Sequence, residues 1–276
     1  MTEQAEDIHA LVREKYGALA RKEASGCGCS CGSADEADSL DMIGDAYKSV
    51  EGYVPDADLG LGCGLPTEHA NIKPGETVLD LGAGAGIDAF VARRLVGEDG
   101  QVYGVDMTPD MVAEARANAE KLGYRNVEFR SGEIERLPFE RDSIDVVISN
   151  CVLNLVPDEA RAFAEIFRVL RPGARFCVSD IVASAPLPDG IRKAAALYVG
   201  CVAGAEPEAD YLGIIRAAGF DDIRIVKSRR IDLPDAVLAG ILTEGELAAM
   251  RDADLHVRSV TVVGIKPMDR SGFRPA

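Results

Sequence analysis

Short runs of apolar, partly β-branched residues recur along this chain, and the segments between them place apolar residues at helical spacing. Runs of the first kind are typical of strands buried in a sheet, and segments of the second kind are typical of helices that cover it. The pattern predicts strands at 77–81, 101–105, 126–130, 145–149, 175–181, 223–227 and 257–265. It predicts helices at 2–23, 38–50, 87–95, 108–123, 159–170, 191–202 and 208–218, and a helical insertion at 234–253.

Strands and helices alternate as far as residue 181, which predicts a Rossmann-like, doubly wound α/β fold with a mostly parallel, seven-stranded sheet. The return from the sixth strand to the seventh favours an antiparallel last strand. We expect three regions: an N-terminal helix with a flexible, cysteine-rich tract (1–50), a nucleotide-binding core (51–185), and a helical and strand segment that completes the sheet (186–276). The last residues, 266–276, are expected to form a mobile tail.

The stretch 77–90, TVLDLGAGAGIDAF, predicts a strand, a glycine turn and a helix. Gly82, Gly84 and Gly86 would let the backbone turn tightly beside a ligand at the helix N-terminus. Asp80 at the strand end suits an ammonium group, and Asp106, 20 positions after Gly86 (106 − 86), suits a ribose. A ligand that carries both groups is S-adenosylmethionine. A nucleotide-type fold that does not bind it is the alternative.

Composition and charge narrow the class of protein further. With 276 residues, 47% of them hydrophobic, the chain can bury a large core, so disorder of the whole chain is excluded. Lysine and arginine number 30 against 46 acidic residues, a net charge of −16, which argues against a nucleic-acid partner. No apolar run approaches about 20 residues and the start lacks a leader pattern, so we expect a soluble, cytoplasmic protein without a membrane partner.

Seven cysteines are the main candidates for chemistry, because the three histidines are scattered in sequence. An odd number of cysteines in a cytosolic chain makes a disulfide framework improbable. One cysteine is expected near the surface in a loop before the first strand, one at the tip of the fourth strand and one on the helix after the fifth: Cys63, Cys151 and Cys201. Three thiolates that converge on a cavity suit a soft ion, whereas three separate packed thiols are the alternative. Cys177, inside a strand, is expected in the core.

Five segments indicate a protein family more specifically than the glycine turn does: LGCGLP (61–66), VDMTPDM (105–111), GEIERLP (132–138), ISNCVLNL (148–155) and GCVAGA (200–205). Together they resemble the arsenite S-adenosylmethionine methyltransferase family, over about residues 47–220. The resemblance implies a class I methyltransferase fold and transfer of a methyl group from S-adenosylmethionine to trivalent arsenic. It makes 51–185 the core that binds S-adenosylmethionine and 186–276 an arsenic-binding segment that completes the sheet.

The resemblance also implies roles for individual residues. Cys151 and Cys201 would hold arsenic with Cys63 as the further thiol, and a tract of three thiols would capture arsenic or relay electrons: Cys27, Cys29 and Cys31. The family has one cysteine there, so this chain departs from its pattern. A thiol reductant of the thioredoxin or glutathione type is the implied partner. The residues implied to bind S-adenosylmethionine are Asp80, Gly82, Gly84 and Gly86 for its amino-acid end, Asp106 for its ribose, Met107, Glu133 and Ile134 for its adenine, and Asn150, through its backbone, for its methionine portion.

Two other functions fit the same sequence. A methyltransferase of the quinone or sterol type would use the same core without needing the thiols. A non-enzymatic, thiol-based metalloid-binding protein would use the thiols without consuming S-adenosylmethionine.

Overall fold

The computed structural model describes residues 13–14, 16–17, 47, 50–194 and 201–268. The cysteine tract of Cys27, Cys29 and Cys31 lies outside these residues, and so do most of the helices expected at 2–23 and 38–50. No helix among the described residues is long and apolar enough to cross a membrane.

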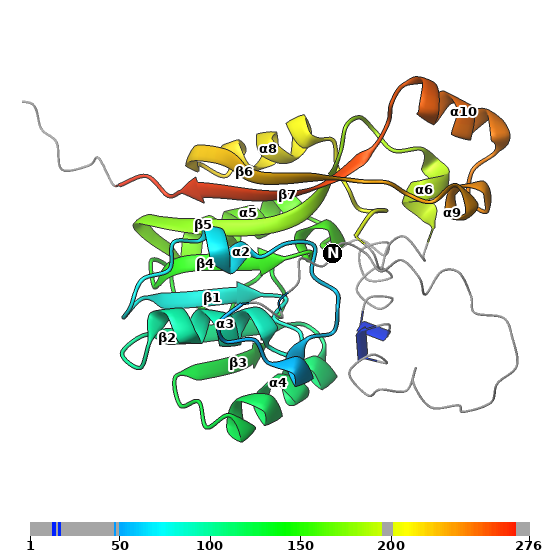
Figure 1. Cartoon of the computed structure of the whole chain (residues 1–276). Coiled ribbons are helices and arrows are strands. Elements are labelled where there is room, and N and C mark those ends of the chain that lie inside the picture. The colour runs from blue at the N-terminus through cyan, green and yellow to red at the C-terminus, as the bar shows by residue number, and fades with distance from the viewer. Residues whose placement is uncertain (1–12, 15, 18–46, 48–49, 195–200, 269–276) are drawn as a thin grey trace, which may run out of the picture.

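A seven-stranded sheet in the order β3-β2-β1-β4-β5-β7-β6 forms the centre of the molecule (Figure 1). β1 to β5 run parallel, and β7 lies antiparallel between β5 and β6, so the predicted doubly wound, mostly parallel sheet is confirmed. The strands are β1 (Thr77–Leu81), β2 (Gln101–Asp106), β3 (Val127–Ser131), β4 (Ile144–Asn150), β5 (Leu170–Ala183), β6 (Asp221–Ile231) and β7 (Val257–Ile265).

Helices cover both faces of the sheet, because successive strand residues point to opposite sides. Leu79 and Leu81 of β1 pack with α5 and α8 on one face, whereas Val78 packs with α3 and α4 on the other. The helices are α2 (Pro66–His69), α3 (Ile87–Val96), α4 (Pro109–Lys121), α5 (Glu159–Val169), α6 (Asp189–Lys193), α8 (Glu208–Ala217), α9 (Asp235–Ala239) and α10 (Glu244–Asp252), with short 3₁₀ turns η4 (Pro55–Ala57) and η5 (Leu153–Leu155).

Two expectations for the C-terminal third were wrong. The helix expected at 191–202 is not continuous: α6 ends at Lys193, Ala194 is extended, and Cys201 has a left-handed φ of 60°, which no α-helix allows, while residues 195–200 lie outside the described part of the chain. Lys266, expected in a mobile tail, is 6% exposed. Its Nζ donates to Asp142 Oδ1 at 2.6 Å and to two carbonyl oxygens of the α5–β5 junction at 2.7 and 2.8 Å, so the chain is anchored beyond β7.

The carboxyl ends of β1, β2 and β4 meet at one edge of the sheet, because these neighbouring strands are parallel. The glycine turn follows β1, Met107 follows β2 and Cys151 follows β4. In an open α/β sheet this edge is where ligands bind. The fold therefore gathers most of the candidate residues in one place.

Candidate functional site

The glycine turn after β1 is built for close approach. Gly86 has a φ of 102°, and a methyl group there would come within 2.8 Å of Phe90 and 2.9 Å of Phe129, so only glycine fits. Gly84 also has a positive φ, but nothing lies within 4 Å of the position of its missing side chain. Its N–H donates to Asp106 Oδ2 at 3.0 Å. The turn is thus pinned to the end of β2 while Gly84 leaves open space beside it.

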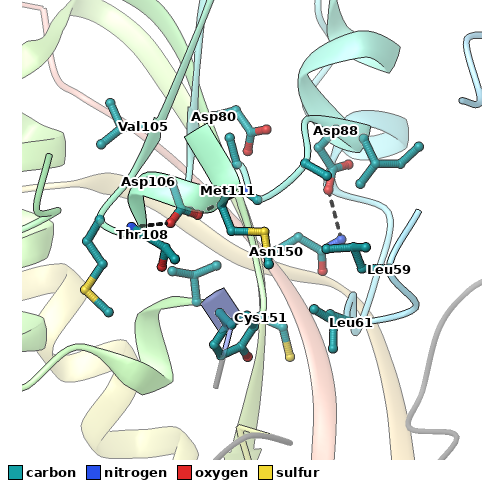
Figure 2. Close-up of a pocket in the computed structure, with 18 of the residues that line it drawn as sticks. Leu59, Leu61, Asp80, Asp88, Val105, Asp106, Thr108, Met111, Asn150 and Cys151 are labelled. Atoms are coloured by element: carbon teal, nitrogen blue, oxygen red, sulfur yellow. Dashed lines mark hydrogen bonds between the residues drawn. The ribbon is translucent and has the colours of Figure 1, made fainter. Parts of the chain in front are cut away.

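A cavity opens at this turn, and Asp80, Asp88 and Asp106 are among the carboxylates that line it (Figure 2). Asp106 Oδ1 also accepts from Thr108 N at 2.8 Å, which fixes its carboxylate. Asp80 and Asp88 are 2% and 4% exposed. Among the described residues, Asp80 Oδ2 and Asp88 Oδ1 are buried oxygens without a hydrogen-bond partner. Buried carboxylate oxygens without donors indicate a site for a cationic group.

The ionisation of these acids supports that interpretation. Burial raises the pKa of Asp80 well above its ordinary value, and the nearby charges of Asp88 and Asp106 raise it further. Burial raises the pKa of Asp88 to about 6, against the hydrogen bonds from Tyr47 and Asn150, which lower it. Burial raises the pKa of Asp106 as well. A positive group in the cavity would relieve this crowding of negative charge.

Three thiols pack together behind the cavity: Cys63, Cys151 and Cys201, at 2%, 6% and 2% exposure. Cys151 lines the cavity itself. Burial raises the pKa of the Cys151 thiol well above its ordinary value, and hydrogen bonds with the thiols of Cys201 and Cys63 raise it further. Burial raises the pKa of Cys63 to about 11. Cys63 and Cys151 are therefore held as neutral thiols.

Backbone hydrogen bonds place these thiols. Cys201 Sγ donates to Cys151 O at 2.9 Å, and Cys63 Sγ donates to Ser179 O at 3.3 Å. Cys151, like Cys201, has a left-handed φ, and its N–H donates to Ser179 O at 2.7 Å. The thiols of Cys63 and Cys201 thus face carbonyl oxygens, and no preformed metal-binding group of three side chains exists within the described part of the chain. A soft ion would have to draw the thiols away from these carbonyls.

Most of the predicted site residues line this one cavity: Asp80, Gly82, Gly84, Asp106, Met107, Glu133, Ile134, Asn150 and Cys151. Gly86 supports the turn from behind, and Cys63 and Cys201 lie beyond Cys151. Cys177 is fully buried in a separate core cluster, with Phe90 of α3 and Ile148 of β4, as expected for a core residue. Cys63 was expected near the surface but is buried, because its loop packs onto Ser179 of β5. Cys27, Cys29 and Cys31 lie outside the described residues.

Three further residues of the site were missed by sequence reasoning. Asp88 and Tyr47 form a hydrogen bond of 2.6 Å at the cavity wall. Tyr16 lines the cavity and packs against the thiol group, and the N-terminal turn that carries it appears in blue beside Cys151 in Figure 2. An acid in the first turn of an apolar helix, as Asp88 is, was a signal in the sequence. Nothing in the sequence distinguished the two tyrosines.

Comparison with known proteins agrees with this geometry. A family model described as a methyltransferase domain matches residues 72–219. An arsenite methyltransferase from Halobacterium salinarum is 45% identical over 80% of this chain and 59% of its own length. An arsenite methyltransferase from Mus musculus is 34% identical over 86% of this chain and 64% of its own length.

A solved structure gives the same result. The crystal structure of an arsenic(III) S-adenosylmethionine methyltransferase from Chlamydomonas reinhardtii is similar with a TM-score of 0.64 and 40% identity, over 75% of this chain and 68% of that one. The chain spans about three fifths of the length of the two curated relatives. The expected class I methyltransferase fold is confirmed by these matches. The chain therefore belongs to the arsenite methyltransferase family, through a class I methyltransferase domain.

Proposed function

We propose that this protein transfers a methyl group from S-adenosylmethionine to trivalent arsenic bound by Cys63, Cys151 and Cys201. One observation carries the proposal: three buried thiols from distant parts of the chain pack together at the wall of a cavity lined by acids and a glycine turn. The relatives named arsenite methyltransferases support it. In this arrangement the acids fit the donor and the thiols fit the acceptor.

The residues present fit S-adenosylmethionine. Asp80 Oδ2 and Asp88 Oδ1 are acceptors without donors in a cavity that would receive an ammonium group, and Gly84 leaves room beside them. Asp106, at the end of β2, would take the ribose, with Met107, Glu133 and Ile134 around the adenine. When bound, S-adenosylmethionine supplies an electrophilic methyl group on its sulfonium. The chain's own part is to fix where that group sits relative to Cys151.

The thiols would act by holding and orienting arsenic. Trivalent arsenic displaces the thiol protons on binding and keeps a lone pair, so the acceptor needs no general base. No histidine is among the described residues that line the cavity. The contribution of the thiols is therefore alignment of the acceptor with the methyl group.

Methyl transfer formally takes two electrons from arsenic. These electrons must be returned to arsenic before it can accept another methyl group. Two thiols of the site would supply these electrons by forming a disulfide, and an external dithiol of the thioredoxin or glutathione type would then reduce it. We propose that Cys27, Cys29 and Cys31 serve arsenic capture or this relay of electrons.

Turnover with different acceptors tests the proposal. The purified protein should form S-adenosylhomocysteine when given S-adenosylmethionine, a dithiol and arsenite, and formation should stop when arsenite is left out. A quinol or a sterol in place of arsenite should give no product above that background. Turnover with the quinol or the sterol but not with arsenite would replace this proposal by the small-molecule alternative.

Binding of the donor should also depend on pH. The ammonium group of S-adenosylhomocysteine needs ionised carboxylates, and the pKa of Asp88 is raised to about 6, with those of Asp80 and Asp106 also raised. Affinity should therefore rise between pH 5 and pH 7.5, by up to about tenfold per pH unit for each proton released on binding. Calorimetry at several pH values, repeated in buffers of different ionisation enthalpy, measures both quantities. Equal affinity at pH 5 and pH 7.5 would show that these acids do not receive the ammonium group.

A further inference from the structure

We infer that the side chain of Asn150 is a positioning residue that couples the donor cavity to Cys63, with Asp88 as the link. The inference rests on the proposed function and deepens it. Asn150 was expected to meet the donor through its backbone alone. Its side chain instead joins three segments that are far apart in sequence: the Cys63 loop, the first turn of α3 and the residue Tyr47.

The amide of Asn150 holds the backbone on both sides of Cys63. Its Oδ1 accepts from Cys63 N at 3.0 Å and from Gly64 N at 3.2 Å. Its Nδ2 donates to Gly64 O at 2.9 Å. Gly62 completes the contact, because a methyl group there would lie 2.7 Å from Asn150 Nδ2. This amide therefore helps to hold the backbone at Cys63, together with Ser259 Oγ, which donates to Cys63 O at 2.6 Å.

Asp88 fixes that orientation from the other side. Asp88 Oδ2 accepts from Asn150 Nδ2 at 3.1 Å, shown by a dashed line in Figure 2, and from Tyr47 Oη at 2.6 Å. With two donors facing Oδ1 of the amide and acceptors facing Nδ2, a flipped amide would lose these bonds. A hydrogen bond to an ionised acceptor is about twice as strong as a neutral one. The amide is therefore held most firmly when Asp88 is ionised.

The donor would control the charge of Asp88. Asp88 lines the cavity, and its second oxygen, Oδ1, is buried without a hydrogen-bond partner. An ammonium group at this oxygen favours the ionised carboxylate. That strengthens the bond from Asn150 and holds Cys63 in place. Donor binding would thus favour arsenic binding, and arsenic binding must favour donor binding by the same factor.

Asp80 provides a matched control. It lines the same cavity and, like Asp88, has a buried oxygen without a partner. Among the described residues, the side chain of Asn150 forms hydrogen bonds with Cys63, Gly64, Tyr47 and Asp88. None of these bonds involves the side chain of Asp80. Loss of charge at Asp80 should weaken donor binding without breaking the link to Cys63.

The experiment measures binding of radiolabelled arsenite by equilibrium dialysis, with and without S-adenosylhomocysteine, in a phosphine reductant that does not compete as a thiol. The ratio of the two dissociation constants is the coupling factor. For the full chain we expect S-adenosylhomocysteine to tighten arsenite binding by about fivefold or more. In D88N and N150A the factor should fall below about twofold, and D80N should keep the factor of the unchanged chain while binding S-adenosylhomocysteine more weakly.

The outcomes separate the coupling from the function on which it rests. If the unchanged chain binds both compounds with a factor of one, the coupling is wrong and the proposed function stands. If D88N keeps the full factor, or D80N loses as much as D88N, Asp88 is not the link. If the unchanged chain does not bind arsenite, both proposals fail. Because N150A removes every polar contact of the amide, D88N, which keeps the shape of the side chain, is the deciding variant should N150A not fold.

Discussion

Replacing Cys151 by serine is expected to reduce arsenite methylation by at least about a thousandfold, or ~4 kcal/mol of transition-state stabilisation. Cys151 lines the cavity and lies between the other two thiols, with hydrogen bonds to both. A serine oxygen is a hard ligand and does not replace sulfur on a soft ion. The measurement is the rate of methylated-arsenic formation by C151S, with binding of S-adenosylhomocysteine as the check that the donor cavity is intact.

Cys177 supplies the control for this prediction. It is a fully buried thiol of β5, but it packs in a separate core cluster with Phe90 of α3 and Ile148 of β4. C177A should cost about 1 kcal/mol or somewhat more in stability and leave the rate per folded molecule unchanged. Equal rates of arsenite methylation for C151S and the unchanged chain would show that the thiol of Cys151 does not bind the arsenic that is methylated.

Gly204→Ala is expected to have the next largest effect, because it forces apart the two loops that carry Cys151 and Cys201. A methyl group at Gly204 would lie 1.9 Å from Asn154 O, so backbone must move. Asn154 cannot retreat freely, since its side chain donates to Ile181 O at 2.9 Å and accepts from Ile181 N at 2.8 Å. We expect a loss of about 2–4 kcal/mol in the free energy of unfolding.

Arsenite binding should suffer more than donor binding, because Gly204 is near Cys201 and distant from the glycine turn in sequence. Denaturant unfolding and the two dissociation constants measure these effects. Gly213→Ala is the matched control: Gly213 lies inside α8 and nothing is within 4 Å of its missing side chain. Alanine there should stabilise the protein by about 0.5–1 kcal/mol. A stable G204A with normal arsenite binding would contradict the packing described for these loops.

The sheet could be predicted from sequence because its signals are local. Each buried strand reads as an apolar run, and β7 was predicted at the residues that it occupies, Val257–Ile265. The helix expected at 191–202 failed as a continuous element, because Ala194 is extended and Cys201 is left-handed. Cys201 takes a left-handed φ where its thiol reaches Cys151 O, and the sequence pattern carries no trace of that bond.

The same limit applies to the site. Asp80, Gly84 and Asp106 could be predicted because spacing along one strand-turn-helix unit fixes their positions. The link from Asn150 to Cys63 could not, because the two residues are 87 positions apart and meet only through the sheet. The burial of Cys63 was missed for the same reason, since the loop glycines that suggested exposure instead let the loop pack closely on β5.

The most direct test of the central claim follows the methyl group itself. The protein is incubated with arsenite, a dithiol and S-adenosylmethionine that carries an isotopic label on its methyl group. The arsenic species are then separated and identified by mass spectrometry. We expect one labelled methyl group on arsenic for each S-adenosylhomocysteine formed, and more product than one equivalent of the protein. S-adenosylhomocysteine formed without labelled methylarsenic, or arsenite bound with neither product, would contradict it.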